Sequence, residues 1–414
     1  MEQVTNLMQQ AWNHPDFWLY AAIPAIAGAI GWATNWLAIK MTFFPVEPIG
    51  WPPFLGWQGV IPSRSEKMSG IFVDNSLAKL GTTAELFEAF ETDELKEHLV
   101  RSLKPRIEEF IDDIMCESNA VVWENLPSLT KRLVYARARS TIPRIADSMM
   151  EEINERSEEL IDMHGMATDL LTRDKTLLNR MFMECGEAEL NFVIKAGLYL
   201  GFLFGVTQML AWIYFPQWWV LPAFGFLVGA TTNWIALNAI FRPLHPYKIG
   251  PVTFLGLFIK RQDEVSKTFA RLSTADVLTV GNMMENILNG PNEVKTRKII
   301  RRHLRPAIDD TVTKLMAQVT FGPTGYVDLK DRLENATLTL GQEIFTDQRF
   351  NRERAPVIEK MLYERMSVMS PEEYQDLIRP AFKEDEWILV AIGGVLGFAA
   401  GVGQLVLLFG QSIL

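Results

Sequence analysis

The chain has 414 residues, of which 48% are hydrophobic and 22% are charged, and this length allows two or more domains. The formal net charge of −10 argues against general nucleic-acid binding, which needs basic surfaces. The apolar residues are concentrated in a few blocks, and many of the 12 Trp residues lie near the ends of those blocks. This placement is typical of residues that anchor membrane helices at the interface.

The first apolar block runs from Phe17 to Phe44 and contains no charge before Lys40. It is longer than the roughly 20 residues that a helix needs to cross the hydrocarbon core. The residues before it lack the basic region and cleavage site of a signal peptide, so we expect the block to remain as a membrane helix. Repeated prolines exclude a regular helix in residues 45–62. We expect a loop there that either lies in the membrane interface or dips into the bilayer.

The next region, residues 63–188, is strongly charged and helical in pattern. Its apolar residues between Leu95 and Ile114 recur at spacings of three or four, which is typical of one face of an amphipathic helix. Pro105 lies inside this pattern and predicts a kink or a break. Few runs in the region are typical of β-strands, so we expect a helical domain.

The second half of the chain repeats this order of elements. Two more membrane helices are predicted at Leu190–Phe215 and Val220–Phe241, and a last one at Trp387–Gly410. The predicted parts are the first membrane helix with its proline loop (1–62), a helical domain (63–188), the second and third membrane helices with a second proline loop (189–259), another helical domain (260–386) and the fourth membrane helix (387–414). The predicted fold class is therefore an all-α, polytopic membrane protein.

One short motif occurs in both halves at matching positions, and it indicates an internal duplication. The equivalent residues are Thr34, Asn35 and Trp36 in the first copy and Thr232, Asn233 and Trp234 in the second. Further matches, such as Phe54-Leu55-Gly56 with Phe254-Leu255-Gly256, keep the same order along the chain. We infer two copies of one module, each built as membrane helix, proline loop, helical domain and membrane helix.

The charges at the helix ends predict the orientation. Basic residues lie on the sides that face the two helical domains: Lys40, Arg64, Lys67, Lys195, Arg242, Lys260 and Arg261. The opposite ends, at residues 1–16, 216–222 and 411–414, have none. Since Lys and Arg prefer cytoplasmic ends, we expect both helical domains in the cytoplasm and both termini outside. The modules are then parallel repeats related by a pseudo-twofold axis along the membrane normal.

Glycines spaced by four residues form a ridge on the second and on the fourth membrane helix. They are Gly197, Gly201 and Gly205 on one helix and Gly393, Gly397 and Gly401 on the other. Small residues on one helix face permit close approach of another helix. The sequence leaves three partners open: the other ridge, a Thr-Asn-Trp helix, or a second subunit.

The Thr-Asn pairs are costly in hydrocarbon and therefore need an explanation. Asn35 and Asn233 either form interhelical hydrogen bonds, worth about 0.6–2 kcal/mol in a membrane, or line a solute path or head-group site. Each lies within a few residues of a basic helix end, at Lys40 or Arg242, and thus near the interface. This position favours the structural role.

Charged residues beside the membrane helices offer further candidate contacts. Arg64 and Arg261 either bind lipid phosphates at the loop ends or are ordinary juxtamembrane charges. Carboxylates before the second and fourth membrane helices favour the helix dipole, and a cation site is the alternative; they are Glu187, Glu189, Glu384, Asp385 and Glu386.

A basic cluster is expected on one helix of the second helical domain. Its members are Lys295, Arg297, Lys298, Arg301, Arg302, His303 and Arg305. Such a cluster either binds anionic lipid or pairs with carboxylates of the first domain, for which we expect Glu108, Glu109, Asp112 and Asp113.

The sequence contains none of the common catalytic signatures, including a P-loop, a zinc-protease motif, a nucleophile elbow and a dinucleotide fingerprint. Cys116 and Cys185 form no metal-binding pattern with the scattered histidines. We therefore expect a protein that is no enzyme and that has no cofactor or metal.

Three stretches together resemble a known family. These are the repeated Thr-Asn-Trp motif followed by Phe-x-Pro, the loop ending at Ile61-Pro62-Ser63-Arg64, and the closing Gly-Phe-x-x-Gly segment. They resemble the YheB/YjiN-type bacterial membrane proteins, a domain-of-unknown-function family. The second loop departs from the pattern, because Ile259-Lys260-Arg261 lacks the proline. The resemblance implies a multi-pass protein of the bacterial inner membrane and brings no catalytic residues.

Three functions follow from these expectations. An oligomeric membrane scaffold or assembly factor comes first, with membrane lipids, further copies of the chain and a cytoplasmic protein as partners and no nucleic acid. A transporter or channel for a small solute is the second, and a lipid-binding or lipid-transfer protein is the third. Buried polar side chains along a continuous void would favour transport. An apolar groove that leads from the proline loops into a helical domain would favour lipid, and a closed, dry interior with a large exposed apolar face would favour the scaffold.

Overall fold

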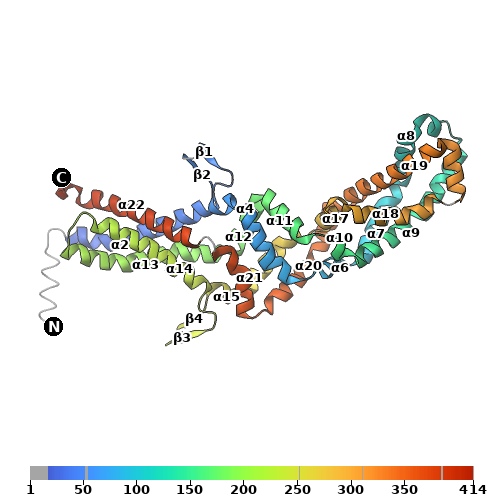
Figure 1. Ribbon diagram of the computed structural model, residues 1–414. Helices are drawn as coiled ribbons and strands as arrows, with labels where there is room; N and C mark the ends of the chain where they lie inside the picture. The colour runs from blue at the N-terminus through green and yellow to red at the C-terminus, as the bar shows by residue number, and fades with distance from the viewer. Residues whose placement is uncertain (1–16, 52–54, 251, 310, 384–385, 414) are drawn as a thin grey trace. The chain divides into compact units, whose positions relative to one another are not determined.

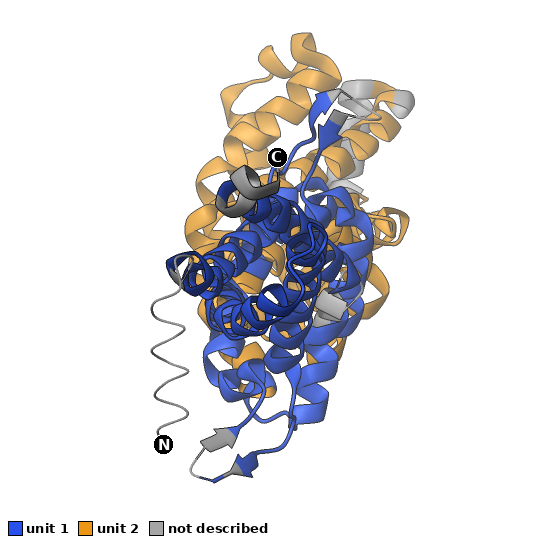
Figure 2. Cartoon of the chain, turned by 90° about the vertical axis from the view of Figure 1, so that its left-hand side faces the viewer, with its two compact units in different colours: residues 1–75, 171–268, 366–414 blue, residues 76–170, 269–365 orange. Residues whose placement is uncertain are grey.

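The computed structural model describes residues 17–51, 55–250, 252–309, 311–383 and 386–413. The described chain is mostly helical and forms two compact units (Figure 2). Unit 1 comprises residues 1–75, 171–268 and 366–414, and unit 2 comprises residues 76–170 and 269–365. Each unit therefore combines segments from both halves of the chain. The predictions for residues 1–16 and for Phe54, Glu384 and Asp385 lie outside the described residues.

The described residues of unit 1 include four helices that are long and apolar enough to cross a membrane, as the sequence predicted. They are α2 (Phe17–Phe43), α13 (Glu187–Tyr214), α14 (Val220–Phe241) and α22 (Glu386–Ile413). Helix α2 packs along α13, α14 packs along α22, and α13 contacts α14 (Figure 1). The four helices thus form two close pairs that meet each other, which buries Ile23, Trp212 and Leu221.

Each proline-rich segment folds into a two-stranded antiparallel hairpin (Figure 1). Strands β1 (Ile49–Trp51) and β2 (Leu55–Trp57) form one, and β3 (Tyr247–Ile249) and β4 (Val252–Phe254) form the other. The sequence correctly excluded a regular helix here, but it predicted no strands, because three residues are too few for an alternating pattern.

Shorter helices complete unit 1 and hold the ends of two of the long helices. They are α3 (Val60–Ser63), α4 (Ser65–Phe72), α12 (Lys175–Cys185), α15 (Leu257–Lys260), α16 (Gln262–Leu272) and α21 (Pro371–Lys383). The amide of Asn179 donates to the carbonyl of Phe43 at 2.6 Å. The amide of Gln375 donates to the carbonyl of Phe241 at 3.2 Å. These bonds satisfy the last carbonyl of α2 and of α14, which lack partners in their own helices.

The secondary-structure elements in the described part of unit 2 are all helical. Its elements are a π-helical turn shared with unit 1 (Val73–Leu77), α5 (Ala78–Leu80), α6 (Thr83–Glu88), α7 (Thr92–Leu103), a 3₁₀ turn (Lys104–Arg106), α8 (Ile107–Glu124), α9 (Ser128–Glu155), α10 (Ser157–Leu160), α11 (Met163–Arg173), a second π-helical turn (Ser273–Val277), α17 (Val280–Asn289), α18 (Glu293–Ile308), α19 (Thr311–Phe345) and α20 (Gln348–Ser367). The break predicted at Pro105 is confirmed, since α7 ends at Leu103 and α8 begins at Ile107.

The long helices of unit 2 pack around two apolar clusters. One cluster joins Ile114 of α8 to Tyr326 and Leu329 of α19, and the other joins Leu288 and Ile300 to Leu338. Helix α19 is interrupted at Gly322, where φ is 77°. Only glycine adopts this region without steric cost, so the residue permits the bend.

Candidate functional site

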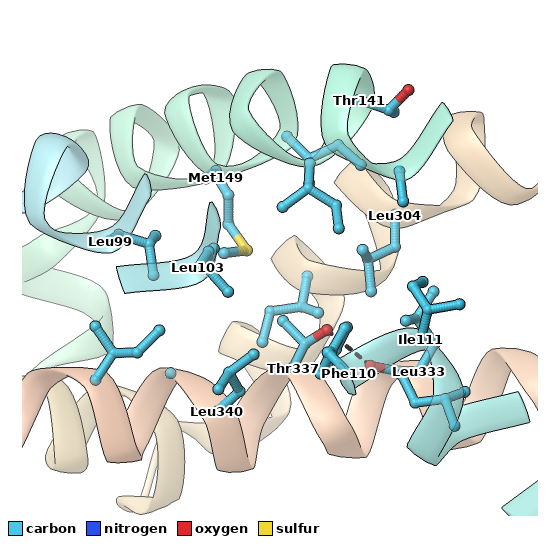
Figure 3. Close-up of a pocket in the computed structure, with 18 of the residues that line it drawn as sticks. Leu99, Leu103, Phe110, Ile111, Thr141, Met149, Leu304, Leu333, Thr337 and Leu340 are labelled. Atoms are coloured by element: carbon cyan, nitrogen blue, oxygen red, sulfur yellow. Dashed lines mark hydrogen bonds between the residues drawn. The ribbon is translucent and has the colours of Figure 1, made fainter. Parts of the chain in front are cut away.

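Helices α7, α8, α9, α18 and α19 of unit 2 surround an apolar cavity of about 680 Å³. Figure 3 shows Thr141 and Met149 of α9 on one side and Leu333, Thr337 and Leu340 of α19 on the other. Other labelled side chains come from α7 (Leu99, Leu103), α8 (Phe110, Ile111) and α18 (Leu304). The sequence predicted helices in this region but gave no signal for a cavity.

The cavity follows from the spacing of apolar residues along two facing helices. On α19, the lining residues Leu329, Leu333, Thr337, Leu340 and Ile344 recur at intervals of three or four and therefore share one helix face. Helix α9 presents a face of the same kind to the cavity. The two faces border a common space, so their side chains line it without filling it.

One end of the cavity is deeply buried and another part reaches the surface. Met150, Met284 and Phe345 line it and are almost completely buried. Leu133 also lines it, yet 60% of this side chain's surface is exposed. The cavity therefore has a closed apolar end and a part that an apolar ligand can enter from solvent.

Few polar side chains line the cavity in the described part of unit 2; they are Thr130, Arg137, Thr141 and Thr337. The hydroxyl of Thr337 donates to the carbonyl of Leu333 at 2.7 Å within its own helix. The hydroxyl of Thr141 is buried and has no hydrogen-bond partner among the described residues. An unsatisfied buried hydroxyl costs about 1–3 kcal/mol. The oxygen of Thr141 points away from the labelled side chains across the cavity (Figure 3), so the lining offers a ligand little polar contact.

Carboxylates of neighbouring helices bind the basic cluster of α18. Arg302 donates to Glu152 of α9 at 2.6 Å, and His303 lies 2.8 Å from the same carboxylate. Arg301 donates to Glu334 of α19 at 2.8 Å. Burial alone would raise the pKa of Glu152, but hydrogen bonds and charges from His303, Arg302 and Arg156 outweigh it and hold this pKa below its usual value.

The sequence predicted that this cluster either binds anionic lipid or pairs with carboxylates of the first charged region. Glu152 is a carboxylate of that region and pairs with the cluster. Within the described part of unit 2, the four carboxylates named from the sequence form no ion pair with the cluster. Glu108 pairs with Arg139, and Asp112 accepts hydrogen bonds from Trp123 and Tyr135. The prediction failed in detail because alignment of the two charged regions says nothing about which turns of their helices face each other.

In unit 1, the two asparagines of the repeated motif make matching contacts. Asn35 donates to the carbonyl of Val193 on α13 at 2.8 Å, and Asn233 donates to the carbonyl of Leu389 on α22 at 2.8 Å. Trp36 and Trp234 are 44% and 59% exposed on the outer faces of their helices. The asparagines therefore link each Thr-Asn-Trp helix to its own partner helix.

The glycine ridges pack against the same Thr-Asn-Trp helices. A Cβ atom added to Gly197 would lie 2.4 Å from the carbonyl oxygen of Gly31, and one added to Gly397 would lie 2.2 Å from that of Gly225. Gly205 and Gly401 approach Pro24 and Pro222 in the same way. Of the three partners that the sequence left open, the structure places the Thr-Asn-Trp helix against each ridge.

A buried amide pair connects α13 to α22. Gln208 donates to the side-chain oxygen of Gln404 at 3.2 Å, and both residues are nearly inaccessible to solvent. Each glutamine lies three residues after a Gly-Phe-x-x-Gly segment, at 201–205 and at 397–401, but the sequence gave no reason to expect that they touch. This buried hydrogen bond stabilises the contact between the two helices that carry the glycine ridges.

Protein carboxylates engage the guanidinium of Arg261. It binds the buried Glu189, in the first turn of α13, at 2.8 Å, and Glu264 at 2.8 Å. Arg64 is exposed at the start of α4. Cys116 and Cys185 form no disulfide, and the described residues contain no group of His, Cys, Asp and Glu that could hold a metal ion.

Comparison with known proteins supports a membrane protein. No family model matches the chain, and no solved structure matches it. A curated relative, a UPF0754 membrane protein of Nostoc sp. (strain PCC 7120), is 27% identical over 168 residues. The match covers 36% of this chain and 39% of the relative, so it spans about two fifths of each. The relative's name specifies a membrane protein and no activity.

Proposed function

We propose that this membrane protein binds lipid, and that the cavity of unit 2 holds an acyl chain. The observation that carries the proposal is the apolar space of about 680 Å³ within a charged, helical unit. Its volume lies in the range of roughly 300–1,000 Å³ that is typical of small-molecule sites. Lipid binding was the third function that the sequence suggested, and the cavity is the observation that moves it ahead of the scaffold.

The packing of unit 2 gives a physical reason for an occupant. Protein interiors are close-packed and contain few voids larger than a water molecule. Lost packing costs about 24 cal/mol per Å³ of cavity, so even a fraction of this volume corresponds to several kcal/mol. Water makes few hydrogen bonds in an apolar space. Each methylene group that enters instead gains about 0.8 kcal/mol.

The two other functions have weaker support. Asn35 and Asn233, which were candidates for a solute path, each donate a hydrogen bond to a partner helix at 2.8 Å. A scaffold that forms homo-oligomers or recruits a cytoplasmic protein is supported by apolar side chains exposed on the long helices, such as Trp36 and Phe202. Lipid tails would cover the same side chains, so this observation does not distinguish a scaffold from an ordinary membrane protein.

We also propose an architecture and a membrane orientation for the chain. We infer two parallel repeats in a bacterial inner membrane, of the YheB/YjiN type, with the charged helical regions in the cytoplasm. The matching bonds from Asn35 to Val193 and from Asn233 to Leu389 support the repeat. The basic residues near the helix ends support the orientation. The proposed activity is binding without catalysis, which is consistent with the absence of catalytic motifs from the sequence.

Trp123 provides a test, because it lines the cavity and is the one Trp in the sequence of unit 2. Brominated fatty acids quench Trp fluorescence at short range. The full chain in lipid nanodiscs would be titrated with such an acid, and the signal of Trp123→Phe subtracted. We expect saturable quenching of Trp123.

Two variants of α9 make this test specific. Ala138 lines the cavity, whereas Ala136 is exposed and does not. Ala138→Phe should fill part of the cavity and weaken the quenching about tenfold or more, while Ala136→Phe should leave it unchanged. If Trp123 is not quenched, or if both variants behave like the wild type, the proposed function is wrong.

A further inference from the structure

A second, charged pocket of about 160 Å³ lies beside the apolar cavity. It is lined by Arg301, Leu304, Arg305, Val327, Lys330, Asp331 and Glu334. Leu304 lines both spaces, so the charged pocket and the apolar cavity are neighbours on α18 and α19. An elongated ligand with one polar end could occupy the two together.

The charges in the pocket favour an anion. Three basic side chains and two carboxylates line it. One carboxylate, Glu334, is already bound by Arg301 at 2.8 Å and by Arg297 at 3.5 Å. Arg305 has no carboxylate within ion-pair distance in the described part of the chain. The uncompensated charge therefore lies on Arg305, and Asp331 is the group that opposes an anion.

We propose that this pocket binds the anionic head group, a carboxylate or a phosphate, of the acyl lipid whose chain occupies the cavity. This inference rests on the proposed function and specifies its ligand. A guanidinium presents several N–H groups in a plane that matches the oxygen atoms of a carboxylate or phosphate. Charge-assisted hydrogen bonds of this kind are about twice as strong as neutral ones. An uncharged alcohol or ester of the same length would make no such bonds.

The test compares two brominated ligands of equal chain length, a fatty acid and the corresponding fatty alcohol, through the quenching of Trp123 in the full chain. The acid should bind about tenfold more tightly than the alcohol, the change expected for one charge-assisted hydrogen bond. Arg305→Gln should remove this preference by weakening the acid alone. Asp331→Asn should strengthen binding of the acid about threefold or more, and a gain cannot result from misfolding.

The control is Arg349→Gln, which removes the same charge from an exposed side chain of α20 that pairs with Glu353. It should change neither affinity. Equal binding of acid and alcohol, unaffected by Arg305→Gln and Asp331→Asn, would overturn the head-group assignment and leave the acyl-binding cavity in place. Failure of both ligands to quench Trp123 would remove the proposed function and this inference with it.

A third probe distinguishes a lipid head group from a free anion. Inorganic phosphate has no chain, so it should displace the fatty acid only weakly. If phosphate competes as effectively as a second fatty acid does, and Arg305→Gln abolishes that competition, the pocket is a site for free anions and the lipid assignment is wrong.

Discussion

The long apolar helix pairs of unit 1 pack much more closely than the helices around the cavity of unit 2. In unit 1, a Cβ atom on Gly197 would lie 2.4 Å from the carbonyl oxygen of Gly31, so the backbones themselves are in contact. In unit 2, a Cβ atom on Gly341 would meet nothing closer than a methyl group of Leu288 at 3.4 Å. The long apolar helices of unit 1 thus have backbones in contact, while α9, α18 and α19 border a cavity. Unit 1 therefore contains closely packed apolar helices, whereas unit 2 contains the space that the proposed acyl ligand requires.

The largest expected effect is at the buried ion pair of unit 1. Arg261→Met leaves the carboxylate of Glu189 buried without its partner, and breaking such a pair costs roughly 3–5 kcal/mol. Because Arg261 is itself partly exposed, the lower end of this range applies. Thermal unfolding in detergent would measure the loss. Restoration of wild-type stability by adding Glu189→Gln would confirm the cause, whereas an unchanged melting temperature in Arg261→Met would contradict it.

Overpacking the glycine contact should have the next largest effect. Gly397→Leu forces a side chain into the backbone of Gly225 and should destabilise unit 1 by about 3 kcal/mol. Gly403 lies on the same helix with nothing within 4 Å of an added Cβ. Gly403→Leu is therefore the matched control and should change stability by less than about 0.5 kcal/mol. Equal effects of the two variants would show that the close approach is not important for stability.

The asparagines allow a test of whether the two helix pairs are independent at this point. Asn35→Ala and Asn233→Ala should each cost about 0.6–2 kcal/mol. The two side chains bind different carbonyl groups, at Val193 and Leu389, so the effects should add in the double variant. A coupling energy above about 0.5 kcal/mol, measured by the same unfolding assay, would indicate that the asparagines interact with each other.

Filling the cavity should change stability in the opposite direction, by stabilising the ligand-free protein. Gly341→Leu places apolar atoms in the cavity and replaces glycine within α19, where glycine costs about 1 kcal/mol relative to a good helix former. We expect the ligand-free protein to become more stable by about 1 kcal/mol and to bind acyl chains less tightly. A loss of stability in calorimetry would show that the space is smaller than the structure indicates.

The smallest effect concerns pH. Since contacts with His303 and Arg302 lower the pKa of Glu152 in the folded protein, its contribution to stability is present above the unfolded value of about 4.5. This contribution is lost as the pH falls through the lower, folded value. Hydrogen exchange should therefore show that α9 and α18 open more readily in acid below pH 4.5. The difference between wild type and Glu152→Gln should shrink over the same range, and a constant difference would contradict the assignment.

The sequence predicted the helices of both units better than the cavity of unit 2. Long apolar runs identify membrane helices, and Pro105 identified the break before α8, because both depend on local chemistry. The cavity depends on how far apart two helix faces lie. The spacing of Leu333, Thr337 and Leu340 predicts that this face is shielded from water, but it is the same for a face in contact with a neighbour and for one that borders a space.

The polar contacts also divide into those that the sequence indicated and those that only the folded structure shows. Asn35 stood out in the sequence because polar groups are costly in a membrane, and its role as a helix contact fits that reasoning. Asn179 and Gln375, which bind the ends of α2 and α14, gave no signal. Amides are common in charged helical segments, and only the folded chain brings these two to the carbonyl groups of Phe43 and Phe241.

The central claim is that an acyl chain occupies the cavity of unit 2, and site-specific photolabelling tests it most directly. A fatty acid that carries a photoactivatable diazirine would be applied to membranes containing the full chain, and the labelled peptides identified by mass spectrometry. We predict labels on the lining faces of α9 and α19, lost in Ala138→Phe and retained in Ala136→Phe. Labels confined to α2, α13, α14 and α22, with unit 2 unlabelled, would contradict the claim.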